Sequence, residues 1–187
     1  MSTSMRFTVS DLELLPDDGK RYEVIDGELY VSTTPDWRHQ LLGTQLGRQL
    51  LNWDPGFQYG MPIIAPGLIF APDQAVEPDV VWVSRERIGT VVGDDGKLHA
   101  APDLVVEILS PGTANQQRDR ELKLKLYSRY GVREYWIVDW RDESVQIYRR
   151  EQTALTLVST VTADETLTSP LLPGFAVTVR ELCARPA

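Results

Sequence analysis

The sequence predicts a single domain of the α/β or α+β class, in which helices flank one β-sheet. The chain has 187 residues, the size of one domain, and 42% of them are hydrophobic, enough to form a substantial core. Short apolar runs typical of strands alternate with two longer segments of helical periodicity. No internal repeat interrupts this pattern. We therefore expect one domain over residues 1–187, with a core at about 20–140 and C-terminal strands over 141–182.

The N-terminal third is expected to hold a hairpin followed by a long helix. Residues 1–20 read as a short helical or loop segment that ends in a turn. Residues 21–31 predict the hairpin, because Asp26-Gly27 is a strong two-residue turn signal between apolar arms. A helix is predicted from about Asp36 to Asn52, with leucines at helical spacing and Asp36 suited to cap it.

The middle third predicts strands. Residues 57–70 suggest strands separated by proline turns, and residues 79–83 a buried strand. A loop rich in glycine and aspartate is expected over 89–102. The uniformly apolar run at 104–109 predicts a second buried strand, which stops at Ser110-Pro111-Gly112.

A second long helix is predicted from about Ala114 to Tyr130, with Gly131 placed to end it in the left-handed conformation. In the remaining chain, strands are predicted at residues 134–139, 144–149 and 154–161, and a packed tail at 171–175. We therefore expect the central sheet to be accompanied by extra hairpin strands at the N-terminal and C-terminal ends of the core.

Composition excludes several classes of protein. No apolar stretch approaches the roughly 18–20 residues of a membrane span, and the N-terminus lacks a signal pattern. The single cysteine, Cys183, excludes an internal disulfide framework and a cysteine-rich zinc site, and it favours a cytoplasmic location. We interpret Cys183 as a small apolar filler or a thiol in the tail.

Charge is unevenly distributed. The net charge of −8 does not suggest a basic coat for nucleic acid. The second helix nevertheless carries a surplus of basic residues, a pattern that also occurs on ordinary solvated helix faces. If the protein binds DNA, the basic side chains of this helix expected to contact it are Arg118, Arg120, Lys125 and Arg129.

Glu107 lies inside the apolar run at 104–109. A carboxylate buried in a strand is unfavourable by several kcal/mol unless it is paired. Glu107 is therefore expected to meet a metal ion, a base or a strong hydrogen-bond donor. The alternative is a glutamate at a strand end that reaches solvent.

Two aspartates, Asp79 and Asp103, each stand at the start of an apolar strand and are candidates to share a metal with Glu107. Asp103 lies on the same face of the same strand, but four residues at about 3.3 Å each place it about 13 Å away, too far to share a metal. Asp79 belongs to another strand, which could lie beside Glu107. Carboxylates from adjacent strands can bind one hard cation, with water and phosphate filling the other positions.

The second predicted helix carries a lysine, Lys123, on the face expected to meet the core. At 100° per residue, Lys123 and Asp119 fall inside the arc of its apolar residues, whereas Lys125 falls outside. A core-facing lysine requires an acidic partner or must extend to the surface. Asp79, Glu107 and Lys123 together suit metal-assisted hydrolysis of a phosphodiester, with the lysine orienting water or offsetting charge in the transition state.

These residues occur in an ordered pattern that resembles the Uma-type endonucleases of the restriction-endonuclease-like PD-(D/E)XK superfamily. The resemblance runs from about residue 7 to 182. It is carried by residues 21–29, Arg38-His39-Gln40, Glu77-Pro78-Asp79, residues 101–111, Asp119, Lys123, Tyr127 and residues 131–139.

The resemblance implies a mixed central sheet flanked by helices and cleavage of nucleic acid with Mg²⁺, for which Mn²⁺ can substitute. It implies that Asp79 and Glu107 hold the metal. Leu109 stands where the parent signature has lysine, and the lysine on the following helix matches Lys123. Relatives also commonly have an aspartate near Leu68, which is absent here.

Additional site residues implied by the resemblance are Glu23, His39 and Asp119. Glu23 is either a third carboxylate or a brace for the first hairpin, and a lone histidine is more often structural than catalytic. The leading hypothesis is a Mg²⁺-dependent DNA endonuclease, plausibly a homodimer because duplex cutting suits two-fold symmetry. The alternatives are a catalytically silent binding or dimerisation module and a hydrolase of small phosphoesters, which would lack a steep salt dependence of DNA binding.

Overall fold

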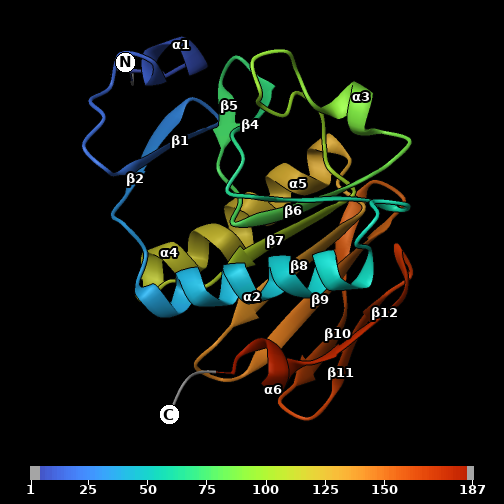
Figure 1. The fold of residues 1–187 in the computed structure, drawn as a ribbon. Helices are drawn as coiled ribbons and strands as arrows, with labels where there is room; N and C mark the ends of the chain where they lie inside the picture. Colours follow the sequence, from blue (N-terminus) through green and yellow to red (C-terminus); the bar gives the residue numbers. More distant parts are fainter. Residues whose placement is uncertain (1–4, 185–187) are drawn as a thin grey trace.

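A six-stranded mixed sheet forms the centre of the protein, in the order β10-β9-β8-β7-β6-β3 (Figure 1). The computed structural model describes residues 5–184, so the first four residues of the expected N-terminal segment lie outside the described part. The six strands are β3 (Gly60–Ile64), β6 (Val80–Ser84), β7 (Leu104–Ile108), β8 (Glu134–Asp139), β9 (Ser144–Glu151) and β10 (Ala154–Thr162). Strands β7 and β8 run parallel, and the other neighbours are antiparallel.

Two smaller sheets complete the strands. A four-stranded sheet has the order β2-β1-β5-β4, and a two-stranded sheet pairs β11 with β12. Their strands are β1 (Arg21–Ile25), β2 (Glu28–Ser32), β4 (Leu68–Ala71), β5 (Gln74–Val76), β11 (Thr166–Ser169) and β12 (Leu172–Thr178). The extra hairpins at both ends of the core, and the mixed sheet between helices, are thereby confirmed.

Helices cover both faces of the central sheet. The long α2 (Trp37–Trp53) packs on one face, while α4 (Thr113–Gln117), a π-helix (Arg118–Lys123) and α5 (Leu124–Tyr130) form the crossover from β7 to β8 on the other (Figure 1). Three four-residue helices lie elsewhere, namely α1 (Val9–Leu12), α3 (Ile88–Val91) and α6 (Val179–Leu182). Within the described residues, no helix is both long and apolar enough to cross a membrane.

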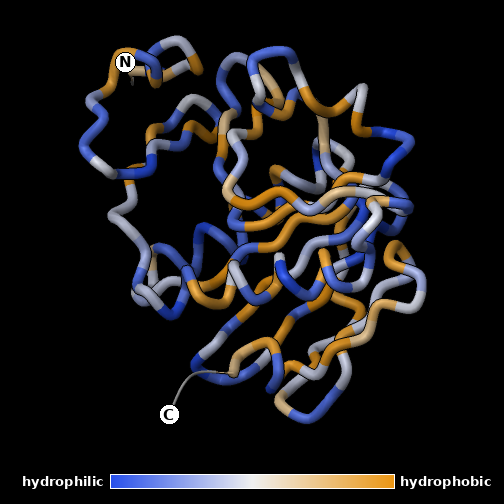
Figure 2. Tube along the Cα trace, in the orientation of Figure 1, coloured by the Kyte–Doolittle hydropathy of each residue, from blue (hydrophilic) through white to orange (hydrophobic). Residues whose placement is uncertain are grey.

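The core is divided by the central sheet, because successive residues of a strand point to opposite faces. Val106 and Ile108 of β7 pack with Leu46 of α2. Val105 on the same strand packs in the other cluster, with Leu126 of α5. Figure 2 shows the apolar run of the central strands between the two helical layers. Glu107 follows the period of Val105 and therefore faces the layer of α5.

Local signals placed the first hairpin and the helix ends correctly. Asp26 and Gly27 have φ of +51° and +74°, the left-handed values that a tight hairpin turn requires. The Asp36 side chain accepts a hydrogen bond from the Arg38 amide at 2.8 Å and caps α2. Gly131 has a φ of +92° and ends the second helical segment as predicted.

Three local predictions need correction. The loop expected over 89–102 overlaps α3, and β5 lies in a segment that was assigned no strand. The expected packed tail is instead part of the β11–β12 hairpin, in which Leu172 and Phe175 are buried. These short elements are held by pairing and packing with distant segments, which local propensity does not encode.

The second long helix is continuous but not uniform. Its middle is a π-helix, a form that is rare and occurs often at functional sites. The wider turn includes both Asp119 and Lys123, whose exposed fractions are 4% and 1%. The prediction that both face the core is confirmed, while the exposed position of Lys125 agrees with its place outside the apolar arc.

Asp103, just before β7, braces the end of the sheet away from Glu107. Its carboxylate accepts hydrogen bonds from the Ser84 amide at 2.8 Å, from Arg87 at 2.9 Å and from Arg133 at 3.0 Å. Asp103 is fully buried. The prediction that it stands apart from a metal site with Glu107 agrees with these structural partners.

We expect Asp103→Asn to lower the free energy of unfolding by about 2 kcal/mol at pH 7, because charge-assisted hydrogen bonds to a buried carboxylate are lost. Although burial opposes ionisation, the Ser84 amide and both arginines hold the pKa of Asp103 below its ordinary value of 3.8. This stabilisation is therefore present at neutral pH and is lost as the pH falls through that lowered pKa. Urea denaturation at several pH values should show the difference from wild type shrinking in acid, and a difference independent of pH would contradict this role.

Candidate active site

The register of the central sheet brings Asp79 and Glu107 together. Strands β6 and β7 are antiparallel, with Val80 opposite Val106. One further step along this register places Asp79 opposite Glu107. The Asp79 carboxylate accepts a hydrogen bond from the Ile108 amide at 2.8 Å, which ties the two strand ends together. The expectation that these two acids come from neighbouring strands agrees with this pairing.

Asp79 is held ionised by its surroundings. Arg21 Nη1 lies 3.0 Å from Oδ1, and His39 Nε2 lies 3.1 Å from Oδ2. Burial alone would raise the pKa of Asp79, but His39, Arg21 and the Ile108 amide outweigh it and lower the pKa to about 2. His39 thus lies in direct contact with a candidate metal ligand, and Arg21 holds the other oxygen.

Glu107 is buried and paired, as the sequence led us to expect. Its Oε1 accepts hydrogen bonds from Lys123 Nζ at 2.9 Å and from the Tyr127 hydroxyl at 2.7 Å. Burial, aided by the negative charges of Asp79 and nearby acids, outweighs the opposing charge of Lys123 and raises the pKa of Glu107 to about 8. This carboxyl group therefore exchanges a proton near neutral pH.

Lys123 joins the helical layer to both sheets. Its Nζ lies 2.8 Å from Glu23 Oε1, 2.9 Å from Glu107 Oε1 and 3.9 Å from Asp119 Oδ1. Burial by itself would lower the pKa of Lys123, but these three carboxylates raise it above its ordinary value. The side chain is therefore an ammonium at neutral pH and acts as a cation rather than as a base.

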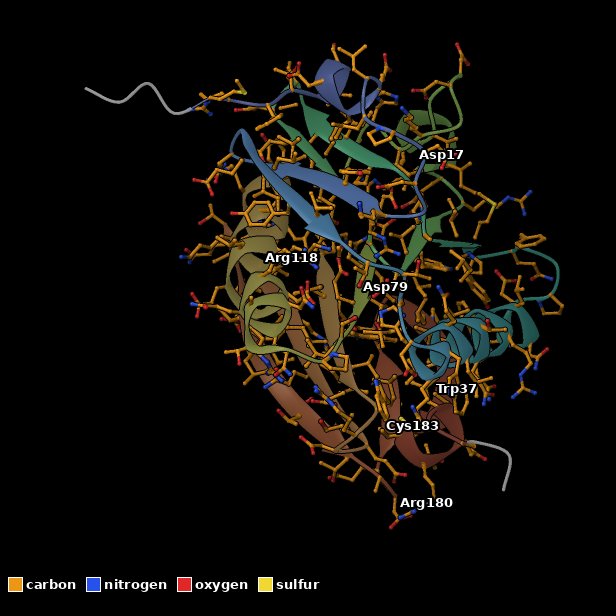
Figure 3. The ribbon with its side chains drawn as sticks, turned by 90° about the vertical axis from the view of Figure 1, so that its left-hand side faces the viewer. Asp17, Trp37, Asp79, Arg118, Arg180 and Cys183 are labelled. Carbon is orange, nitrogen blue, oxygen red and sulfur yellow. The ribbon has the colours of Figure 1, made fainter. Side chains whose placement is uncertain are left out.

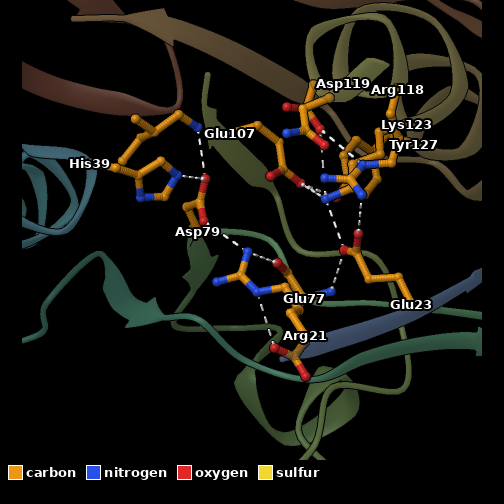
Figure 4. A network of polar contacts seen from close by, with 12 residues as sticks. Arg21, Glu23, His39, Glu77, Asp79, Glu107, Arg118, Asp119, Lys123 and Tyr127 are labelled. Carbon is orange, nitrogen blue, oxygen red and sulfur yellow. Dashed lines mark hydrogen bonds and ion pairs between the residues drawn. The ribbon is translucent and has the colours of Figure 1, made fainter. Parts of the chain in front are cut away.

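Two further acids complete the cluster (Figure 4). Glu23 on β1 is fully buried, accepts from the Glu77 amide at 2.9 Å and contacts Lys123, so it braces the first hairpin and also adds charge to the site. Burial raises the pKa of Asp119 to about 6 despite the opposing charges of Lys123 and Arg118. Among the described residues, Asp119 Oδ1 and Glu23 Oε2 are buried oxygens without a hydrogen-bond partner.

A cavity of about 400 Å³ opens onto this cluster. Its walls come from the β2–α2 connection, the start of α2, the ends of β6 and β7, and the π-helix. The ionisable side chains that line it are Arg21, Asp36, His39, Asp79, Glu107, Arg118, Asp119 and Lys123. In Figure 3, which views the molecule from the side where α2 begins, Arg118 and Trp37 lie on opposite sides of Asp79.

The four basic residues expected to contact DNA have different surroundings. Arg118 points into the cavity, 3.7 Å from Glu23 and 3.8 Å from Asp119. Arg120 bonds Gln146, and Arg129 pairs with Asp26 at 2.6 Å. Lys125 is exposed. A continuous basic surface from these four side chains is therefore not formed, and their contact with DNA stays a prediction.

Arg21 and Tyr127 were not singled out as site residues from the sequence, and Arg118 was expected to contact DNA rather than to line the cavity. Arg21 and Glu23 alternate along β1 and so share a face, a period-two signal that could have linked them. Tyr127 is one helical turn from Lys123, and both reach Glu107. Arg118 belongs to the π-helix and lines the cavity together with Asp119 and Lys123.

The donor set at this cavity fits a hard divalent cation. Carboxylate oxygen is the ligand that Mg²⁺ prefers, and Mg²⁺ commonly uses one or two carboxylates together with water and substrate phosphate. Asp79 and Glu107 can supply two, and the buried Asp119 Oδ1, which accepts no hydrogen bond from the described residues, shows that not every acceptor there is satisfied. Within the described residues, no group of three or more His, Cys, Asp or Glu side chains is arranged to hold a metal, so the protein alone would supply an incomplete set of ligands.

Comparison with known proteins identifies the family. The family model Uma2, described as "Putative restriction endonuclease", matches residues 9–180. A crystal structure from Anabaena variabilis, described as "a putative nuclease belonging to DUF820", has the same fold with a TM-score of 0.75. That structure is 17% identical, and the match covers 95% of this chain and 97% of the other. No curated protein matches the sequence. With nearly the whole chain matched, the protein belongs to the Uma2 family.

Proposed function

We propose that this protein is a metal-dependent endonuclease that hydrolyses phosphodiester bonds of DNA. The observation that carries the proposal is the meeting of Asp79, Glu107 and Lys123 at one cavity, from two strands and a helix. Membership of a nuclease family supports hydrolysis of nucleic acid. Asp79 and Glu107 would hold Mg²⁺, which when bound supplies Lewis-acid chemistry to polarise the phosphate and acidify water.

The protein's own side chains supply charge and proton transfer. The ammonium of Lys123 and the guanidinium groups of Arg21 and Arg118 line the cavity, where they offset negative charge that grows on the phosphate in the transition state. The carboxylate of Asp119 suits a general base, because its pKa of about 6 lies near neutral pH and its Oδ1 accepts no hydrogen bond from the described residues.

One observation favours a second candidate, the catalytically silent module. Asp79 and Glu107 already contact partners within the protein, namely Arg21, His39, Lys123 and Tyr127. A retired site could persist as a structural ion network of this kind. The two functions differ in whether a cation can compete with these internal partners.

Calorimetric titration with Mn²⁺ at pH 8.5, where Glu107 is largely ionised, tests the proposal. We expect wild type to bind the metal and Asp79→Ala and Glu107→Ala to lose binding while staying folded. Asp103→Asn is the matched control, since it alters a buried carboxylate near the same strand without touching the cavity. Normal binding by either site variant would refute the metal assignment.

If wild type binds no metal alone, the titration is repeated with a short DNA duplex, because substrate phosphate can complete the coordination of Mg²⁺. Binding only in the presence of DNA supports a site completed by substrate. Absence of binding in both titrations supports the silent module. A small-phosphoester hydrolase would be distinguished by DNA binding that lacks a steep dependence on salt.

A further inference from the structure

An exposed tryptophan stands beside the mouth of the cavity. Trp37 is the first residue of α2 and is 56% exposed. Asp36 and His39, on either side of it in the sequence, line the cavity, and His39 contacts Asp79. Single exposed apolar residues are common, so the exposure of Trp37 acquires meaning only from its neighbours.

Those neighbours form a layered stack. The guanidinium carbon of Arg38 lies 4.7 Å from the ring centroid of Trp37 and 5.6 Å from that of Trp140. Asp36 holds the same guanidinium at 3.2 Å. Trp140 packs against the core, so the stack is anchored at one end and ends at Trp37. A fixed aromatic ring with a large exposed area is suited to stack on another flat π-system.

The depth of the candidate catalytic groups restricts what can reach them. Asp79, Glu107 and Lys123 are 6%, 2% and 1% exposed. A phosphate must therefore enter a cavity of about 400 Å³ to reach them. In a regular duplex each phosphate is held along a rigid, paired helix, whereas a strand with unpaired bases can bend inward. Enzymes that act on a base within a deep pocket meet a comparable limit, and they act on single strands or extrude the nucleotide.

Electrostatics at the mouth also disfavours a duplex. The chain carries a net charge of −8. Duplex DNA has one negative charge per roughly 1.7 Å of its axis and relies on contacts from free cations. Asp36, which lines the cavity, is paired with Arg38, and at the end of β8 Arg141 is paired with Asp139 at 2.8 Å. Stacking on an aromatic ring does not require surplus positive charge and does not depend on sequence.

We propose that Trp37, held by Arg38 and Trp140, stacks an unpaired base beside the phosphate that enters the cavity, and that the substrate class is single-stranded or locally unpaired DNA. This inference rests on the proposed function for the reaction at the cavity. Trp37 is a positioning residue: it holds the strand and takes no part in bond cleavage.

The test compares one oligonucleotide as a single strand and as a duplex. All proteins carry Glu107→Gln to prevent cleavage, and binding is measured by fluorescence anisotropy at several salt concentrations. We expect the single strand to bind more tightly than the duplex. Trp37→Ala should weaken single-strand binding by about 5–150-fold, from a stacking contribution of 1–3 kcal/mol per base, and should change duplex binding less than about twofold. The ratio between the two proteins should not depend on salt, because stacking releases no counterions.

Two matched variants separate stacking from general effects. Trp37→Phe keeps an aromatic face and should restore most of the affinity for the single strand. Phe57→Ala removes another aromatic side chain, 44% exposed, beyond the other end of α2, and should leave binding unchanged. An unchanged midpoint of thermal unfolding for Trp37→Ala shows that the loss reflects binding.

The inference is overturned if Trp37→Ala binds the single strand like the parent protein, or if it weakens single-strand and duplex binding equally. Failure of the proposed function is a separate result. Wild type with Mn²⁺ would then leave both DNA forms uncut, while the binding preference set by Trp37 could still be measured.

Discussion

Lys123→Met is expected to lower the rate of DNA hydrolysis by about 10²–10³-fold while leaving Mn²⁺ binding intact. Methionine retains the volume of the aliphatic stem but removes the ammonium that lies 2.9 Å from Glu107 and 2.8 Å from Glu23. The substitution should also lower the free energy of unfolding by about 3 kcal/mol, because a buried carboxylate is left without its cation. Single-turnover cleavage and urea denaturation measure the two effects.

The two effects of this substitution can be separated. The double variant Glu23→Gln, Lys123→Met removes one of the stranded carboxylates, so it should recover stability and remain inactive. Glu23→Gln alone keeps the contact between Lys123 and Glu107 and should retain activity. If stability and activity recovered together in the double variant, Lys123 would have only a structural role.

Glu107→Gln is expected to be more stable than wild type by about 2–4 kcal/mol at pH 8.5 in the absence of metal. Burial and the neighbouring acids raise the pKa of Glu107 from 4.5 to about 8. Glutamine keeps an oxygen that can accept from Tyr127, and Lys123 keeps Glu23 as its partner. The neutral amide therefore removes an unfavourable buried charge without leaving donors unpaired, a gain in stability that comes with loss of function.

The sign of the pH dependence follows from the raised pKa. Between pH 4.5 and about 8 the folded protein retains a proton on Glu107 that the unfolded chain has released. This contribution to wild-type stability is full below pH 4.5 and is lost as the pH rises through 8. Urea denaturation should show the two proteins converging at pH 4.5 and diverging above it.

Addition of metal should close most of this stability difference at high pH. Mn²⁺ at 100 times its dissociation constant would stabilise wild type by about 2.7 kcal/mol and would leave Glu107→Gln unchanged. Equal stability of the two proteins at pH 8.5 without metal would show that Glu107 is well accommodated as a buried anion. Equal stabilisation of both by Mn²⁺ would place the metal elsewhere.

Most of the secondary structure was predictable because its signals are local. The Asp26-Gly27 turn, the Asp36 cap and the left-handed Gly131 each depend on a few adjacent residues. The β11–β12 hairpin and β5 were not found, since β5 pairs with the distant β1 and β12 packs on the distant α2, contacts that outweigh weak local propensity. Membership of the Uma2 family, expected from the ordered motifs, is confirmed by the family model over residues 9–180.

The candidate site was partly predictable for a thermodynamic reason. An ionisable residue in an apolar run or on an apolar helix face needs a partner, and this requirement pointed to Glu107 and Lys123 before any contact was known. Arg21 and Arg118 were not recognised in that way. For a charged residue near a strand end or on a helix surface, the neighbouring sequence does not show whether the side chain is buried. Its role depends on the residues that surround it in the folded protein.

By itself, the sequence determined the class of the fold, and its ordered motifs indicated the family. Apolar runs and helical periodicity, which act within short segments, pointed to Asp79, Glu107 and Lys123 as candidate site residues. The tertiary structure decided how these groups are charged. The β6–β7 register sets Asp79 against Glu107, and the π-helix brings Asp119, Arg118 and Lys123 to one cavity. Coulomb interaction and desolvation depend on distance and burial in three dimensions, so a pKa of about 2 for Asp79 and of about 8 for Glu107 arises only in the folded chain.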